Sequence, residues 1–357
     1  MNRRTQTADL LKGIAVLLMI QVHIIELFAS NTIYNSIIGK ILLFLGGPPV
    51  APVFMAIFGY FIAASKRSSL QLIIRGMKFF ALGMFLNIAL NLNLIISVNR
   101  GLLQIDLLPY IFGVDILQFA GIAIIIIAIF KKAFENNLFF VLICILISSF
   151  MGNLLSNFSP ETDVMRYICS FIYGCSKWSY FPLFPWLAYP LIGIAFYQFK
   201  KQYGVTDINK SISDIFKKPE AQRFFKQMMG VVFFLFLLLT GRYAVSVASN
   251  LPSYYHHEFI FMVWTLIFLA LYSFNMNEIN NFAREFILFK YIKWLGKNVT
   301  IMYVLQWILI GNTATEIYKT VTSPLYLVIY FFAVLGIASG ISYLLIGLKE
   351  RFFKKAV

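Results

Sequence analysis

Apolar residues along this chain come in blocks of about twenty, separated by short polar or basic connections. A helix of about that length crosses the roughly 30 Å hydrocarbon layer of a membrane. The pattern therefore predicts an all-α, polytopic membrane helix bundle of about ten transmembrane helices. The predicted spans are 9–29, 47–64, 71–91, 109–130, 138–152, 181–199, 228–248, 259–276, 295–311 and 325–347.

Composition makes a soluble fold a poor alternative. Hydrophobic residues make up 60% of the chain and charged residues only 13%, about half the charged share of a typical soluble domain. Arg3 and Arg4 precede the first apolar run as they would in a signal peptide, but no small-residue cleavage site follows, so we expect a retained span. We find no repeat and predict a single domain over 1–357, with a cytoplasmic loop at 200–227.

The net charge of +15 has an explanation in membrane topology rather than in nucleic-acid binding. If the N-terminus lies inside, the outward connections hold only a few basic residues, and the rest of the 30 lysines and arginines lie on the cytoplasmic side. The outward ones are Lys40, Arg100, Arg166, Lys177, Arg242 and Lys319. This bias predicts that both termini are cytoplasmic, with the lipid bilayer and not nucleic acid as the partner.

The first span carries an unusual set of ionisable residues, Asp9, Lys12, His23 and Glu26. Such groups are costly inside a membrane, so each is a functional candidate. Their spacings of three and eleven residues place them on roughly one helix face. His23 can take up and return a proton near neutral pH, and Glu26 is spaced to orient its ring. The alternative is a packing histidine bonded to a neighbouring backbone.

Other polar residues fall in the outer halves of separate predicted spans. They are Asp115 and Gln118, Arg242, and Tyr303 and Gln306. Their similar depth predicts one polar cavity that opens outward. Single interhelical hydrogen bonds are the alternative for each of them.

Two further groups have less specific interpretations. His256 and His257 are adjacent and offer too few ligands for a metal, so we expect no metal ion and interfacial side chains, with the mouth of the polar cavity as the alternative location. Cys169 and Cys175 both fall outside on this topology and could form a disulfide or remain free thiols. The sequence has no Gly-rich nucleotide loop and no serine-nucleophile elbow, and we expect no bound cofactor.

Several stretches resemble the transmembrane acyltransferase clan, which includes acyltransferase family 3 and the heparan-alpha-glucosaminide N-acetyltransferase-like proteins. TADLLKGIAVLLMIQVH (7–23) resembles the first helix of the clan, with Lys12 in place of the family-3 arginine ten residues before the histidine. Four more stretches are similar to helices of the glucosaminide branch, in the same order, with Gln306 where several relatives have histidine. They are PPVAPVFMAIFGYFIAASKR (48–67), GVDILQFAGIAIII (113–126), PLFPWLAYPLIGIAF (182–196) and WLGKNVTIMYVLQWIL (294–309).

The resemblance implies a membrane-bound O- or N-acyltransferase. It would move an acyl group, typically acetyl, from cytoplasmic acyl-CoA as co-substrate to an extracytoplasmic glycan or lipid-linked sugar, in a bacterial cytoplasmic membrane. The expected catalytic residues are His23, Glu26 and Asp115. The expected substrate-binding residues are Lys12, Gln118, Arg242, Tyr303 and Gln306.

Two rival functions fit the same intramembrane polar residues. A transporter or flippase of a polar or lipid-linked substrate is the first, although the two halves of the chain show no repeat. A non-enzymatic partner in an envelope complex is the second. Transfer of label from acetyl-CoA separates the enzyme from both.

Overall fold

A computed structural model describes residues 3–203, 212, 215–282 and 286–354. In that part of the chain the secondary structure is helical, without a strand, and only isolated bridges join Ala29 to Val321 and Val114 to Ser179. The all-α prediction is therefore confirmed. The chain divides into two compact units, each made of separate stretches of sequence: unit 1 comprises Met1–Val50, Ile88–Leu107 and Asn280–Val357, and unit 2 comprises Ala51–Asn87 and Leu108–Ile279. The prediction of a single domain stays a prediction.

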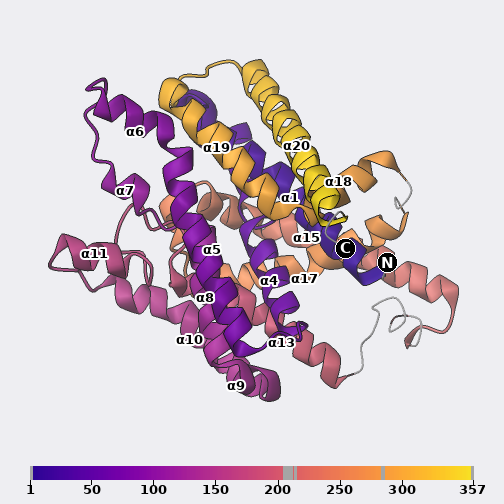
Figure 1. The fold of residues 1–357 in the computed structure, drawn as a ribbon. Helices are drawn as coiled ribbons and strands as arrows, with labels where there is room; N and C mark the ends of the chain where they lie inside the picture. The colour runs from indigo at the N-terminus through magenta and orange to yellow at the C-terminus, as the bar shows by residue number, and fades with distance from the viewer. Residues whose placement is uncertain (1–2, 204–211, 213–214, 283–285, 355–357) are drawn as a thin grey trace. The chain divides into compact units, whose positions relative to one another are not determined.

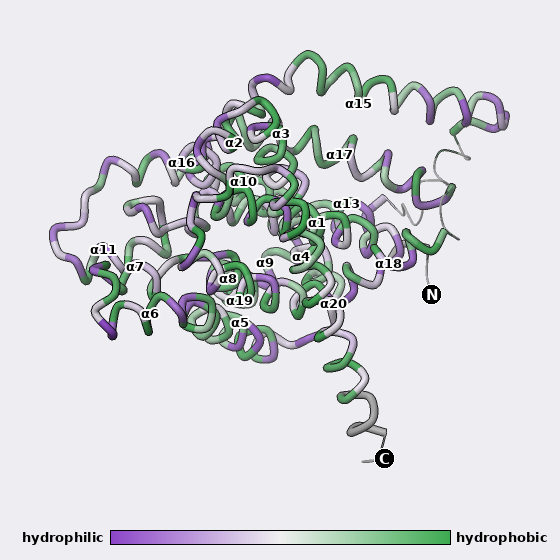
Figure 2. The backbone as a smooth tube through the Cα atoms, turned by 90° about the horizontal axis from the view of Figure 1, so that it is seen from above, coloured by the Kyte–Doolittle hydropathy of each residue, from purple (hydrophilic) through white to green (hydrophobic). Residues whose placement is uncertain are grey.

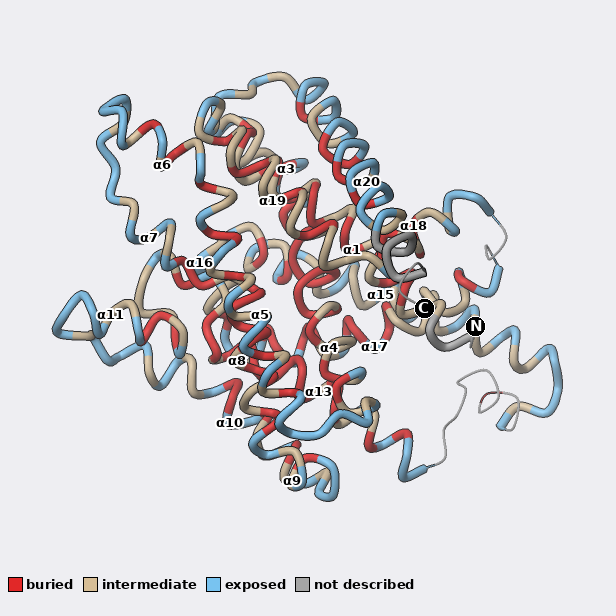
Figure 3. Tube along the Cα trace, in the orientation of Figure 1, coloured by how far each residue is buried: buried red, intermediate tan, exposed pale blue. Residues whose placement is uncertain are grey.

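Unit 1 is organised around the first helix. Its helices are α1 (Arg3–Leu27), α2 (Asn31–Asn35), α3 (Ile37–Gly46), α6 (Leu92–Asn99), α18 (Ile287–Lys297), α19 (Val299–Ile317) and α20 (Pro324–Lys354). Helix α1 contacts α3, α18, α19 and α20, and Figure 1 shows α1 alongside α19 and α20. The apolar segment of α1 is 56% buried, against 17% for that of α20, a contrast visible in Figure 3. The ionisable residues of α1 therefore lie on the central helix of this unit.

Two glycines allow α1 and α18 to approach closely. A Cβ atom on Gly13 would lie 1.8 Å from the carbonyl oxygen of Ile292, and one on Gly296 would lie 1.9 Å from that of Asp9. Small residues of this kind let helix backbones approach in membrane proteins. This contact fixes the register of α1, and with it the height of Lys12 and His23.

The remaining helices lie wholly or mostly in unit 2. They are α4 (Ala51–Ala63), α5 (Ser69–Leu90), α7 (Leu108–Ile111), α8 (Ile116–Ile129), α9 (Lys131–Asn136), α10 (Leu138–Ser156), α11 (Asp163–Cys169), α12 (Leu183–Trp186), α13 (Ala188–Gln202), α15 (Pro219–Ala248), α16 (Leu251–Tyr255) and α17 (Phe259–Phe282). Helix α13 packs against α4 and α10. Gly59 and Gly193 permit the first contact, because a Cβ atom on either would lie within 2.0 Å of a backbone oxygen of the other helix.

Seven helical segments of the described chain are long and apolar enough to cross a membrane. They are Gln6–Leu27, Ile37–Ala63, Ser69–Leu90, Leu138–Ser156, Pro219–Ala248, Phe259–Phe282 and Pro324–Leu348, and Ile116–Ile129 is a shorter apolar helix. Figure 2 shows the apolar stretch of α15, which is only 11% buried. The count of about ten spans and the inside location of both termini stay predictions.

Some predicted boundaries differ from the structure. Helix α3 lies in a stretch that we expected to be a connection, and α4 begins at Ala51 rather than at residue 47. The predicted span 295–311 is interrupted, because Asn298 leaves the helical conformation (φ −106°, ψ 22°) between α18 and α19. Part of the predicted loop at 200–227 lies outside the described residues, and α15 begins within it at Pro219.

Candidate functional site

His23 of α1 forms a hydrogen bond with Gln306 of α19 inside unit 1. The distance from Nδ1 of His23 to Oε1 of Gln306 is 3.0 Å. The amide nitrogen of Gln306 donates to the backbone oxygen of Tyr303, 3.3 Å away, which turns the amide oxygen toward the imidazole. A carbonyl oxygen only accepts, so Nδ1 carries the proton and Nε2 is left with a free lone pair. This arrangement prepares Nε2 to accept a proton.

Trp307 restrains the imidazole ring of His23 against tilting. Its indole stacks on the imidazole of His23 with ring centroids 3.9 Å apart and an interplanar angle of 29°. The hydrogen bond from Nδ1 restricts rotation in the ring plane, and the stacking restricts tilt out of it. Sequence reasoning did not select Trp307, although an aromatic residue beside a polar one in an apolar span was the available signal.

Lys12 is occupied by a partner on its own helix. Its ammonium lies 2.9 Å from a carboxylate oxygen of Asp9, and both side chains are largely buried. Lys12 and His23 are separated by about 16 Å along the helix axis, from the 1.5 Å rise per residue. The ion pair thus neutralises much of the charge of Lys12 at the opposite end of α1 from His23.

Glu26 acts electrostatically on Tyr34 and Lys319, which lie beyond the C-terminal end of α1 in the sequence. The ammonium of Lys319 lies 3.6 Å from the ring centroid of Tyr34. Burial lowers the pKa of Lys319, and Glu26 partly offsets this. Burial, with smaller contributions from Glu26 and Tyr318, raises the pKa of Tyr34 to about 12. The role of Glu26 toward His23 stays a prediction.

Asp115 and Gln118 form a capping box at the start of α8 in unit 2. The side chain of Asp115 accepts from the backbone N–H of Ile116 at 2.7 Å, and the N–H of Asp115 donates to Oε1 of Gln118 at 3.3 Å. Gln118 also donates to the oxygen of Gly113, 3.3 Å away. Both predicted site residues are therefore placed locally by helix capping.

Arg242 lies exposed on α15 of unit 2, whereas Tyr303 is buried on α19 of unit 1. The structure brings together His23, Tyr303 and Gln306 in one unit, and Asp115 with Gln118 in the other. A single cavity that joins the two groups stays a prediction.

Residues 4–221 match the family model described as heparan-alpha-glucosaminide N-acetyltransferase, catalytic, which is more than half of the chain. The chain belongs to this acetyltransferase family. Comparisons with curated proteins and with solved structures found no match. The predicted family resemblance is confirmed.

Membership of the acetyltransferase family and the long apolar helices support the same conclusion about the class of protein. Together they show an integral, multi-pass membrane protein of a transferase family. The matched residues include Lys12, His23 and Asp115, and they end before Tyr303 and Gln306. The partner of His23 is therefore supplied by a part of the chain outside the family match.

The two adjacent histidines of this family member lie in an aromatic cluster between α16 and α17. The hydroxyl of Tyr189 donates to Nε2 of His257 at 2.9 Å, and Nδ1 donates to the oxygen of Tyr254 at 2.8 Å. Nε2 of His256 donates to the oxygen of Ser179, 2.7 Å away. Burial lowers the pKa of His256, and it lowers that of His257 to about 4. Both rings are held neutral as structural parts of unit 2.

Mild acid should destabilise the protein through His257. The unfolded chain takes up a proton near the ordinary histidine pKa of 6.5, whereas the folded state resists it down to about 4. Stability therefore falls as the pH drops through this window, by about 2 kcal/mol at pH 5. Unfolding temperatures at pH 7.5 and pH 5 in detergent measure it. His257→Phe should flatten the dependence relative to wild type, and an unchanged pH slope would contradict the assignment.

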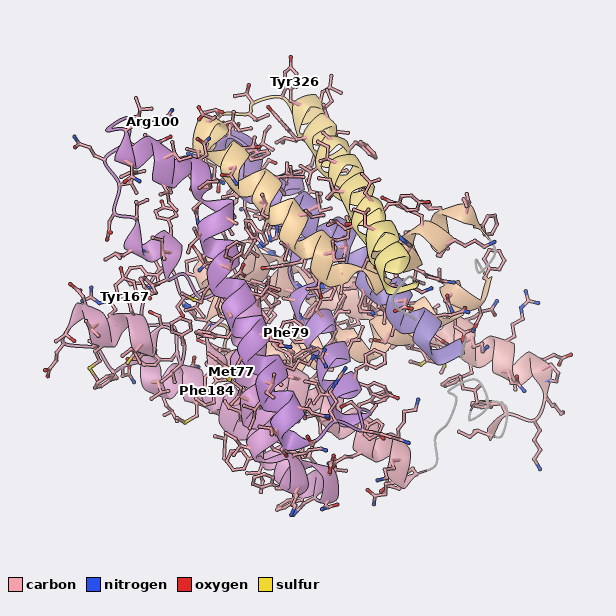
Figure 4. The ribbon with its side chains drawn as sticks, viewed as in Figure 1. Met77, Phe79, Arg100, Tyr167, Phe184 and Tyr326 are labelled. Atoms are coloured by element: carbon pink, nitrogen blue, oxygen red, sulfur yellow. The ribbon has the colours of Figure 1, made fainter. Side chains whose placement is uncertain are left out.

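The predicted outer connection around α11 is ordered by hydroxyl and aromatic contacts. Tyr167, labelled in Figure 4, stacks on Trp178 with centroids 5.0 Å apart. The hydroxyl of Ser179 donates to the oxygen of Ser170 at 2.5 Å. Cys144, Cys169 and Cys175 are free thiols, so of the two alternatives for the outer cysteines the structure has the unpaired one.

Proposed function

We propose that the protein transfers an acetyl group from cytoplasmic acyl-CoA to an amine or hydroxyl of an extracytoplasmic glycan or lipid-linked sugar, in a bacterial cytoplasmic membrane. The observation that carries this proposal is the hydrogen bond from Nδ1 of His23 to Gln306. It leaves Nε2 as a base on a helix that lies within the acetyltransferase match. The basic connections predicted on the inner side suit an anionic donor such as acyl-CoA.

The proposed reaction uses Nε2 of His23 twice. As the acceptor nitrogen or oxygen attacks the thioester carbonyl carbon, Nε2 takes the acceptor proton. The carbon–sulfur bond then breaks, and the imidazolium returns that proton to the departing thiolate. Oε1 of Gln306 supports the transient imidazolium by accepting from Nδ1. In a two-step variant Nε2 itself attacks the thioester carbonyl carbon, the carbon–sulfur bond breaks and the CoA thiolate leaves. The acceptor then attacks the acetyl carbon, the bond from Nε2 to that carbon breaks, and the acceptor proton neutralises the thiolate.

The other expected residues complete the proposal. Glu26 and Asp115 are assigned to catalysis in addition to His23. Lys12, Gln118, Arg242 and Tyr303 are assigned to binding of the two substrates, together with Gln306. The ion pair with Asp9 means that Lys12 contributes to donor binding as part of a nearly neutral pair.

A labelling experiment tests the function. The purified full chain is reconstituted in vesicles with radiolabelled acetyl-CoA and a crude envelope glycan mixture. Label on the glycan supports transfer, and additional acid-labile label on the protein supports the two-step variant. Movement of glycan across the vesicle membrane without label transfer would contradict the proposal and favour a transporter or flippase.

A further inference from the structure

Unit 2 contains a cavity of about 370 Å³ apart from every residue assigned above. It lies where α4, α8 and α13 end and α9 begins. Its apolar wall includes Ile62, Leu72, Ile127 and Ile194. Cavities of this size hold small ligands in many proteins. On the predicted orientation this end of unit 2 faces the cytoplasm.

The charged groups that line the cavity are mostly cationic. Lys66, Lys131 and Lys201 line it together with one acidic residue, Glu135. Lys131 is partly engaged, since its ammonium lies 3.4 Å from Glu135 and donates to the backbone oxygen of Arg67 at 2.7 Å. Three lysines against one carboxylate leave the cavity with an excess of positive charge.

Two neutral groups in the cavity wall are buried and have no hydrogen-bond partner in the described part of the chain. Gln198 is 8% exposed, and its Nε2 has no hydrogen-bond partner among the described residues. The hydroxyl of Ser65 is likewise buried without a described partner. A buried unsatisfied polar group costs free energy, so a ligand that supplies an acceptor gains from filling this space. The amide nitrogen and the ammonium groups are donors only, which favours a ligand rich in acceptor oxygens.

A structural role explains only part of this arrangement. Lysines near helix C-termini offset the partial negative charge of those ends, and three helices end here. That role accounts for the lysines, but it gives no partner to the buried amide of Gln198. The combination of cations with unpartnered donors is what an oxyanion site requires.

We propose that this cavity binds the phosphate group of a ligand. The phosphate oxygens would accept from Nε2 of Gln198, the hydroxyl of Ser65 and the ammonium groups of Lys66 and Lys201. Two sources share this chemistry: the headgroup of an anionic phospholipid in the adjacent leaflet, and a soluble nucleotide. The inference does not depend on acetyl transfer, because none of its residues is among those assigned individually to catalysis or substrate binding in that reaction.

The test uses the full chain in phosphatidylcholine nanodiscs with two probes. ADP binding is measured by calorimetry, and phosphatidylglycerol binding by native mass spectrometry after the lipid is mixed in. The variants are Gln198→Leu and the double variant Lys66→Gln/Lys201→Gln. Lys132→Gln/Lys218→Gln is the matched control. Both lysines are exposed and lie outside the cavity lining, and their replacement removes the same amount of positive charge as the cavity double variant.

We expect one probe to bind, with affinity about tenfold weaker in Gln198→Leu and about ten- to hundredfold weaker in the double variant. The control should bind as wild type. The unfolding temperature of Gln198→Leu should not fall, because leucine removes an unsatisfied amide, so lost binding would not reflect lost folding. Binding of ADP alone identifies a soluble ligand, and binding of phosphatidylglycerol alone a lipid. Binding of neither probe, or equal binding by cavity and control variants, overturns the proposal.

Discussion

Replacement of His23 by alanine should lower the rate of acetyl transfer by about 10²–10⁴-fold, the usual contribution of a general base. The physical reason is the loss of Nε2, the nitrogen left unprotonated by the bond from Nδ1 to Gln306. Initial rates of label transfer from acetyl-CoA to glycan measure the effect. The unfolding temperature should change little, because one stacking contact and one hydrogen bond are lost. Wild-type activity in the folded variant would remove His23 from the mechanism.

A second variant separates the orientation of the ring from its presence. Gln306→Leu keeps the approximate shape but removes the acceptor of Nδ1–H, so the proton redistributes between the two ring nitrogens and the rate should fall by about tenfold. Gln21→Leu is the matched control, since Gln21 lies on α1 and both of its buried amide atoms lack described partners. Equal loss in the two variants would mean that Gln306 acts through packing rather than through His23.

The close approach of α1 and α18 should be the least tolerant contact in unit 1. Gly13→Ala and Gly296→Ala each place a Cβ atom within 2.0 Å of a backbone oxygen, so the helices must separate. Overpacking against backbone costs about 3 kcal/mol or more. We expect sharply reduced yield of folded protein and a lower unfolding temperature, measured by fluorescence-detected chromatography on membrane extracts.

The matched controls for the α1–α18 contact are Gly336→Ala and Gly340→Ala on α20. A Cβ atom at either position meets nothing within 4 Å among the described residues. Because alanine has the higher helix propensity, these variants should be neutral or gain up to about 1 kcal/mol. Comparable loss of folded protein in both pairs would show that the α1–α18 approach is not what constrains Gly13 and Gly296.

The length of apolar segments determined much of the architecture without reference to tertiary structure. Partition between lipid and water acts on each block of residues separately, so α1, α10 and α17 fall close to their predicted spans. The motif around His23 and the order of the later stretches were also enough to identify the family. Asp115 and Gln118 had a local signal as well, because an acidic residue three positions before a glutamine is a capping-box pattern.

Boundaries were less predictable where two short helices share one apolar run. Hydropathy alone does not register the break at Asn298, because one polar residue barely changes the average over a window of about nineteen residues. Helix α3 was missed for a different reason: its 10 residues are about half the length of a membrane span, so a search for blocks of about twenty left it in a connection.

Only the tertiary structure decided which polar groups meet. His23 and Gln306 are far apart in sequence and come together because Gly13 and Gly296 set the height of α1. The direction of the Gln306 amide then fixes which nitrogen of His23 carries the proton, and Trp307 supplies the stacking surface. Helix formation and membrane insertion follow from local composition, whereas contacts between side chains depend on how whole helices pack. Helix formation and membrane insertion can therefore be predicted from one sequence, whereas the side-chain contacts between helices required the tertiary structure.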